Sequence, residues 1–160
     1  MAAKLDFSLK ELEAFIVKAK AATYVGDGQK TGSCRLGSHD LKFEEGSFSY
    51  LDSYFGGSDF IGQEVAYYKD RPVWAMNYYG RILDPERISP AEAGRMIKES
   101  LSKMYAEAGR FLGGFEHTAG NLHYTDTSQG KVSSFMGKEW IARDNVKVYE
   151  LDYHGGLIKD

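Results

Sequence analysis

Apolar residues recur at helical spacing in two segments of the chain, and each segment follows an S-x-x-E capping box. The first box begins at Ser8 and the second at Ser89, with a glutamate three residues later in each. In such a box the serine and glutamate side chains each bind a backbone amide that the first helical turn leaves without a partner. The pattern therefore predicts helices over residues 9–21 and 90–108.

Strand patterns follow each predicted helix. Alternating polar and apolar residues, bounded by turn-forming residues, are typical of strands. The predicted strands cover residues 41–51, 60–68 and 72–79 in the first half and residues 120–125, 135–143 and 146–153 in the second. The short connections at Lys69–Arg71 and Asp144–Asn145 predict that the last two strands of each half form hairpins.

The two halves also share sequence. Residues 60–83 match residues 135–158 at one constant offset, and Glu64 thereby corresponds to Glu139. We predict an α+β fold built by internal duplication of an α-β-β-β unit, with antiparallel sheets, one main helix per unit and a pseudo-twofold axis. The chain, residues 1–160, should form a single domain whose repeats cover about 7–83 and 88–158.

Strand alternation divides each predicted hairpin into two faces, because neighbouring residues point to opposite sides of a sheet. We expect one apolar face to pack on the helices, formed by Ile61, Val65, Tyr67, Trp74, Met76 and Tyr78 in the first half and by Met136, Trp140, Ala142, Tyr149, Leu151 and Tyr153 in the second. The opposite face is mixed and holds the candidate ligand-binding residues Glu64, Tyr68, Asn77, Tyr79, Glu139, Asp152 and His154. That face is either a solvated surface or the floor of a cleft between the repeats.

Glu64 and Glu139 are the centre of this candidate site. If the pseudo-twofold axis brings them together, each carboxylate raises the pKa of the other, and burial raises both further. A shared proton or a bound cation would relieve the repulsion. The residues around them differ between the halves, since Asn77 and Tyr79 correspond to Asp152 and His154.

Composition narrows the classes of function. The net charge of −3 and the lack of a basic cluster argue against direct binding of nucleic acid. No apolar run has the length of a membrane span and the first residues do not resemble a signal peptide, so we expect a cytoplasmic protein. The single cysteine, Cys34, and the spacing of His117, His123 and His154 do not match a metal site, and no motif indicates a cofactor.

The segments FIGQE, MNYYG, VYELDYHGG and AATYV resemble a family of bacterial domains of unknown function. Members of that family occur alone or fused behind a helix-turn-helix DNA-binding domain, and the resemblance covers about residues 7–158. The fused members imply a role in sensing an effector. The duplicated plan is also similar to the gyrase-inhibitor-like effector-binding domains, which hold cationic ligands with a buried glutamate among aromatic residues; this is an analogy of fold.

Three functions remain open. The leading hypothesis is an effector-type module that binds a small amphipathic or cationic molecule between the repeats. The second is a small hydrolase or isomerase in which a cleft glutamate acts as base and Tyr79 or His154 as acid. The third is a protein–protein interaction module. A homodimer is the commonest assembly of such chains, but the sequence does not fix the oligomeric state.

Overall fold

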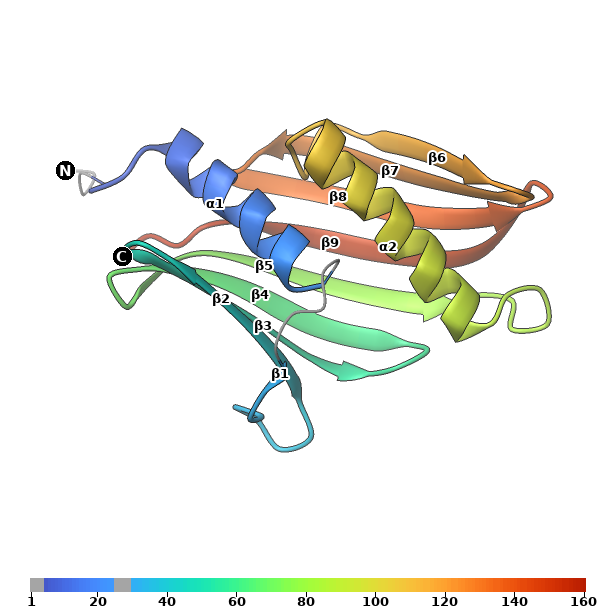
Figure 1. Cartoon of the computed structure of the whole chain (residues 1–160), viewed down its shortest axis with the longest axis horizontal. Coiled ribbons are helices and arrows are strands. Elements are labelled where there is room, and N and C mark those ends of the chain that lie inside the picture. Colours follow the sequence, from blue (N-terminus) through green and yellow to red (C-terminus); the bar gives the residue numbers. More distant parts are fainter. Residues whose placement is uncertain (1–4, 25–29) are drawn as a thin grey trace.

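The computed structural model describes residues 5–24 and 30–160, and there the chain forms two helices and one nine-stranded antiparallel sheet (Figure 1). The helices are α1 (Leu9–Ala22) and α2 (Pro90–Glu107). The strands are β1 (Lys30–Thr31), β2 (His39–Glu45), β3 (Phe48–Gly56), β4 (Phe60–Tyr68), β5 (Arg71–Ile82), β6 (Phe115–Ala119), β7 (Leu122–Lys131), β8 (Ser134–Arg143) and β9 (Val146–Leu157). The α+β class predicted from the sequence is confirmed.

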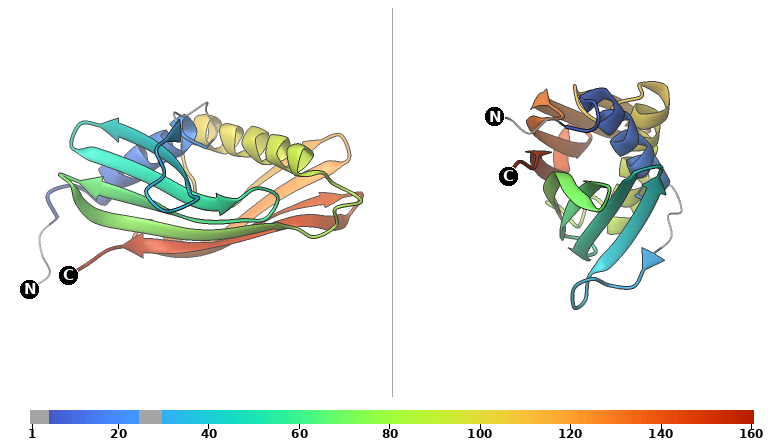
Figure 2. Two further views of the ribbon diagram at one scale, coloured as in Figure 1. Left: turned by 90° about the horizontal axis from the view of Figure 1, so that it is seen from below. Right: turned by 90° about the vertical axis from the view of Figure 1, so that its left-hand side faces the viewer.

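Both helices lie on the same face of the sheet, which curves around them (Figure 2). The strand order is β1-β2-β3-β4-β5-β9-β8-β7-β6, so each half runs towards the centre and the two final hairpin strands, β5 and β9, pair with each other. Helix α1 packs on strands β2 and β3, and α2 packs on β6 and β7. Each helix therefore covers the strands of its own half.

The helix starts agree with the sequence patterns. Ser8 and Ser89 are the N-caps, and both capping boxes are complete. The Ser8 hydroxyl accepts a hydrogen bond from the amide of Glu11 at 3.1 Å, and that of Ser89 accepts one from the amide of Glu92 at 3.2 Å. Capping satisfies donors that the first turn of a helix otherwise leaves exposed, which fixes the point where each helix begins.

The prediction of three strands per half is wrong, because a further hairpin precedes β4 and β8. Gly46 and Gly120 form the turns of these hairpins with φ angles of 62° and 61°. A positive φ costs glycine little, so the chain reverses at these positions, where an uninterrupted strand was expected for residues 41–51. All of β2 pairs with residues 48–54 of β3, and all of β6 pairs with residues 122–126 of β7.

The predicted β4–β5 and β8–β9 hairpins are confirmed. Their two-residue turns have φ angles of 49° and 63° at Lys69 and Asp70, and of 50° and 64° at Asp144 and Asn145, as a type I′ turn requires. Each hairpin then shifts register, between Ala66 and Tyr67 in the first half and at the corresponding place in the second. One additional residue on one strand is a β-bulge.

These bulges correct the predicted faces of the sheet. A bulge reverses which residues of two paired strands share a face, because side chains alternate with a period of two. Glu64 therefore pairs with Met76, and Glu139 pairs with Leu151, so both glutamates point to the helices together with the apolar residues of β5 and β9. Ile61 and Met136, expected in the core, are on the outer face and are 55% and 61% exposed.

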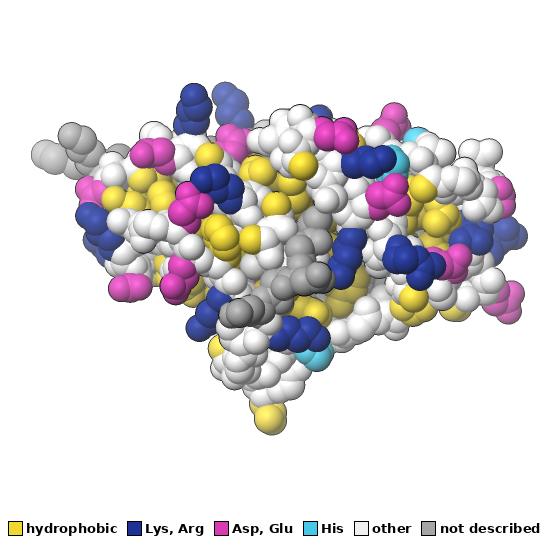
Figure 3. Space-filling model, viewed as in Figure 1, with side chains coloured by type: hydrophobic (Ala, Val, Ile, Leu, Met, Phe, Trp, Pro, Cys, Tyr) yellow, Lys and Arg dark blue, Asp and Glu magenta, His cyan; other side chains and the backbone are white. Residues whose placement is uncertain are grey.

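The core lies between the helices and the inner face of the sheet. It includes Leu12, Ile16, Trp74, Met96, Met104, Ile141 and Tyr149. Figure 3 shows charged side chains of both signs dispersed over the face that carries the helices, with apolar side chains visible between them. Among the described helices, neither is long and apolar enough to cross a membrane.

Candidate functional site

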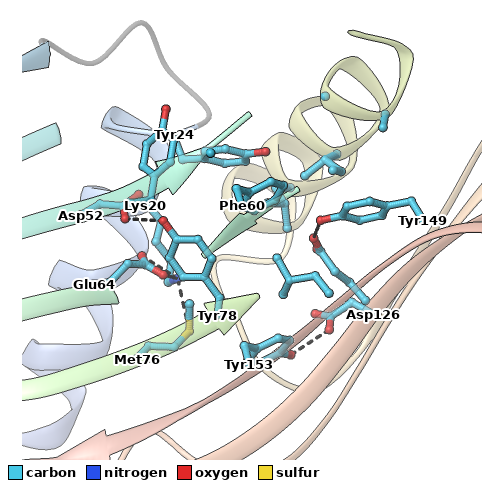
Figure 4. A pocket seen from close by; sticks show the side chains of 18 of the residues that line it. Lys20, Tyr24, Asp52, Phe60, Glu64, Met76, Tyr78, Asp126, Tyr149 and Tyr153 are labelled. Atoms are coloured by element: carbon cyan, nitrogen blue, oxygen red, sulfur yellow. Dashed lines mark hydrogen bonds and ion pairs between the residues drawn. The ribbon is translucent and has the colours of Figure 1, made fainter. Parts of the chain in front are cut away.

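A cavity of about 230 Å³ separates the helices from the sheet near the centre of the molecule (Figure 4). Both helices and strands of both halves contribute to its wall. Its aromatic residues are Tyr24, Tyr54, Phe60, Tyr78, Tyr105, Phe111, Tyr149 and Tyr153, and its charged residues are Lys20, Asp52, Glu64, Asp126 and Glu139. Apolar walls with a few buried polar groups are typical of sites for small molecules.

The carboxylate of the first half, Glu64, forms a closed ion pair. Lys20 of α1 donates hydrogen bonds to both carboxylate oxygens of Glu64, at 2.9 Å to Oε1 and 2.8 Å to Oε2. Tyr50 donates a third hydrogen bond to Oε1. The ammonium also lies over the ring of Phe111, 5.1 Å from its centroid. Lys20 and Glu64 are each only 5% exposed. The attraction between the two charges therefore offsets the cost of removing both from water, and Glu64 needs no cation from outside the protein.

The corresponding carboxylate of the second half, Glu139, has phenol partners in place of an ammonium. Tyr124 and Tyr149 donate hydrogen bonds to its two oxygens, the latter at 3.0 Å. Within residues 5–24 and 30–160, no lysine or arginine forms an ion pair with Glu139. Burial raises the pKa of Glu139 to about 7, although the two phenol hydrogen bonds act in the opposite direction.

Two aspartates complete the acidic group. Asp52 of β3 lies opposite Glu64 in the strand register, and Asp126 of β7 lies opposite Glu139. Each accepts a hydrogen bond from a tyrosine, Asp52 from Tyr78 at 2.6 Å and Asp126 from Tyr153 at 2.7 Å. Burial raises the pKa of both aspartates to about 6. The cavity thus carries four buried carboxyl groups and one buried ammonium.

The acids of both halves raise the pKa values of the same two cavity tyrosines, Tyr105 and Tyr24. The pKa of the Tyr105 phenol is raised by burial and by the negative charges of Glu64, Glu139 and Asp126. That of the Tyr24 phenol is raised by burial and by Glu139 and Asp52. These tyrosines therefore stay protonated and can donate hydrogen bonds to an acceptor in the cavity.

The structure separates the seven predicted ligand-binding residues. Glu64 and Glu139 line the cavity. Tyr68 lies outside it, with its ring 5.0 Å from those of Phe7 and Phe48. The four remaining residues, Asn77, Tyr79, Asp152 and His154, are on the outer face of the sheet, where Asn77 and His154 approach to 3.3 Å. The bulges explain this separation, since they move the glutamates to the other face.

Asp152 and His154 line a second depression on that outer face, together with Lys138. The Lys138 ammonium is 3.3 Å from Asp152 Oδ1. The two side chains are 39% and 63% exposed, so this ion pair contributes little to stability. Among the described residues, no three His, Cys, Asp or Glu side chains are grouped so that they could hold a metal ion.

The predicted ligand-binding residues did not include Lys20, Asp52, Asp126 or any of the six tyrosines that line the cavity. The sequence contains a signal for the lysine and for the aspartates. Lys20 follows Leu12 and Ile16 at helical spacing, so it is a charge on the apolar stripe of its helix. Asp52 and Asp126 occupy matching positions in the two halves, just as the glutamates do.

Residues 52–158 match the model of DUF5680, a domain of unknown function. The match covers well over half of the chain, and the chain therefore belongs to this family. The matched segment contains all four acids of the cavity, whereas Lys20 and Tyr24 precede it. Searches of the curated proteins and of the solved structures found no match.

Proposed function

We propose that this protein is a small-molecule-binding module that takes an amphipathic amine into the cavity between its helices and its sheet. One observation carries the proposal: three buried carboxyl groups, those of Asp52, Asp126 and Glu139, face an aromatic cavity and have no cationic side chain paired with them among the described residues. An ionised carboxylate is unstable in such a place unless a cation joins it. A ligand ammonium supplies that cation.

The size of the cavity limits the ligand. A buried cavity of about 150 Å³ is large enough to bind benzene. The present cavity, at about 230 Å³, has room for one aromatic ring with a short side arm. Phenethylamine and tryptamine are ligands of this kind. Their rings would pack on Phe60 and Tyr149, which lie with ring centroids 6.5 Å apart in the cavity wall.

The experiment compares wild-type protein with phenethylamine, tryptamine and the neutral analogue 2-phenylethanol. We expect both amines to raise the melting temperature and to bind by calorimetry, and 2-phenylethanol to bind at least about tenfold more weakly because it leaves the carboxylates unpaired. Equal binding of the alcohol and the amines, or binding of none of the three, would contradict the proposal.

A variant of α2 tests whether the ligand enters the cavity. A side chain at Gly94 would extend into open space, and Gly94 lines the cavity. Gly94→Phe should therefore block binding without touching any acid. Gly94→Ala is the matched control, which should keep the affinity of the wild type and strengthen the helix slightly.

The finer features of the fold fit this function. We infer that the two halves arose by internal duplication, since the hydrogen bonds Tyr50–Glu64 and Tyr78–Asp52 of the first half have counterparts at Tyr124–Glu139 and Tyr153–Asp126 in the second. In this proposal the protein is cytoplasmic, and bacterial relatives fused to helix-turn-helix domains use the same cavity to sense an effector.

Catalysis is a second candidate, favoured by Glu139. A carboxyl group with a pKa of about 7 can give and take protons near neutral pH, which suits a hydrolase or an isomerase. Its acid partner would be Tyr124 or Tyr149, because the previously considered Tyr79 and His154 are on the outer face. A pH–rate profile that loses its inflection near pH 7 in Glu139→Gln would support this function over binding alone.

A further inference from the structure

The capping boxes place the two helices in equivalent positions. When Ser8 is aligned with Ser89, the glutamates of the boxes also align, and Tyr24 falls on Tyr105. Both tyrosines line the cavity, so the alignment holds in space as well as in sequence. At the same offset Lys20 falls on Leu101, and both of these side chains also line the cavity.

This pair breaks the equivalence of the two halves. The acids match, since Asp52 and Glu64 correspond to Asp126 and Glu139. One tyrosine per acid matches as well. In the first half, however, the helix brings an ammonium to the glutamate, whereas in the second half the aligned residue of the helix is the apolar Leu101 and a further phenol, that of Tyr149, donates to the glutamate.

The Lys20 ammonium makes the contacts expected of a bound alkylammonium ligand. Its ammonium donates to both oxygens of Glu64, lies 3.8 Å from the sulfur of Met76 and faces the ring of Phe111. A carboxylate, a soft apolar contact and an aromatic face are the groups that recognise an alkylammonium ion. The Lys20 side chain thus indicates that the subsite at Glu64 binds a primary ammonium group.

We propose that Glu139 is the subsite for the ammonium of an external primary amine, and that Lys20 is a built-in occupant of the equivalent subsite at Glu64. The inference rests on the proposed function and narrows it. The ligand carries one ammonium, which lies next to Glu139 and Asp126. The helix of the second half supplies no cation there, because Leu101 stands at the position that aligns with Lys20. A dication finds only one free subsite.

Exchange of the two helix residues tests the inference with phenethylamine as the probe. Leu101→Lys brings an ammonium to Glu139 and should weaken phenethylamine binding at least about tenfold, while Leu101→Met, which keeps the size and the neutrality, should weaken it much less. Lys20→Leu frees the second subsite, so phenethylamine binding should then survive Glu139→Gln, which abolishes it when Lys20 is present.

The double variant Lys20→Leu/Leu101→Lys moves the free subsite to the first half. It should recover binding of one amine, and that binding should now be lost on Glu64→Gln and not on Glu139→Gln. This arm stands even if a single variant fails to fold, because the exchange keeps the same two side chains in the cavity.

The outcomes separate the two proposals. Wild-type affinity in folded Leu101→Lys, or loss of amine binding in folded Lys20→Leu/Glu139→Gln, would overturn the inference while the proposed function stands on wild-type binding and its block by Gly94→Phe. A wild-type protein that binds neither amine would overturn both.

Discussion

The residues Glu64 and Glu139 occupy equivalent places in sequence and fold, yet they differ in charge balance. Glu64 forms a buried ion pair with Lys20, whereas the hydrogen-bond partners of Glu139 among the described residues are phenols, and burial raises the pKa of Glu139 to about 7. The same substitution should therefore change the stability of the protein in opposite directions at the two positions.

Glu64→Gln should lower the free energy of unfolding by about 3–5 kcal/mol, because removal of one partner leaves the Lys20 ammonium buried and unpaired. Urea denaturation at neutral pH measures the loss. Lys20→Met combined with Glu64→Gln removes both charges, and we expect the double variant to recover most of the stability. A single variant as stable as the wild type would show that the pair contributes little.

Glu139→Gln should raise the free energy of unfolding at pH 8. The pKa of about 7 in the folded state lies above the ordinary glutamate pKa of 4.5, so between these pH values the folded state binds more protons than the unfolded state, and stability falls as pH rises. Above about pH 7 the deficit is on the order of 3 kcal/mol. Glutamine has no proton to lose, so the variant should lack this part of the fall.

Thermal denaturation between pH 4 and pH 8 checks this prediction. The wild type should lose stability across the interval, with Asp52 and Asp126 adding to the effect because burial also raises the pKa of each to about 6. In Glu139→Gln the curve should be flatter. If the two curves stay parallel, Glu139 does not carry a raised pKa.

At the scale of residues, the sequence indicated that the two glutamates occupy matching positions, and the structure places both in the cavity wall. Their hydrogen-bond partners were not predicted. Lys20 could not be paired with Glu64 in advance, because which acid a buried lysine meets depends on how the helix crosses the sheet. Asn77, Tyr79, Asp152 and His154 were grouped with the glutamates only because the strands were assumed to be regular.

Among the elements, the two bulged hairpins determine the site. Each bulge brings a glycine opposite a tyrosine, Gly62 opposite Tyr78 and Gly137 opposite Tyr153. A Cβ added at Gly137 would lie 2.1 Å from the ring of Tyr153, and one at Gly62 would lie 2.5 Å from the hydroxyl of Tyr78. The missing side chains leave room for the tyrosines that bind Asp52 and Asp126.

Gly137→Ala should therefore displace Tyr153, break its hydrogen bond to Asp126 and destabilise the protein by about 1–3 kcal/mol. Chemical denaturation measures the change, and phenethylamine binding should weaken with it. Gly32→Ala is the control, since nothing lies within 4 Å of a Cβ there. Equal stabilities of the two variants would contradict the close fit.

Sequence patterns predicted the helices and the positions of the two tight hairpin turns, because caps and turn residues are local signals. The bulges lie only a few residues from the turns, but no residue type at Ala66–Tyr67 or Ile141–Ala142 indicates a bulge. A shift of one residue exchanges the faces of a strand, so this small omission moved every predicted contact of the hairpins.

On the scale of the whole molecule, both halves must be assembled before the cavity exists. Its wall combines α1 and β3–β5 with α2 and β7–β9, and the acids of both halves surround it. Ligand binding should therefore depend on the charge of the whole cavity in addition to that of Glu139.

Amine affinity should rise as the pH rises from about 5 to about 8. An ammonium prefers ionised carboxylates, and the carboxyl groups of Asp126 and Glu139, with pKa values of about 6 and about 7, lose their protons across this interval. A primary amine, like a lysine, stays charged up to about pH 10. Calorimetric titration with phenethylamine at several pH values measures the trend, and 2-phenylethanol should show none. A flat profile for the amine would contradict the prediction.

The pairing of β5 with β9 also bears on how the chain reaches its native state. Strand β5 lies at the centre of the sheet, but its neighbour β9 is translated after the other eight strands of the described residues. A nascent chain on the ribosome must therefore hold an open, hydrogen-bonding edge until Val146–Leu157 emerges, and such edges invite association with other chains. Release of the last strand from the exit tunnel then closes the sheet and brings the two halves together in one late step.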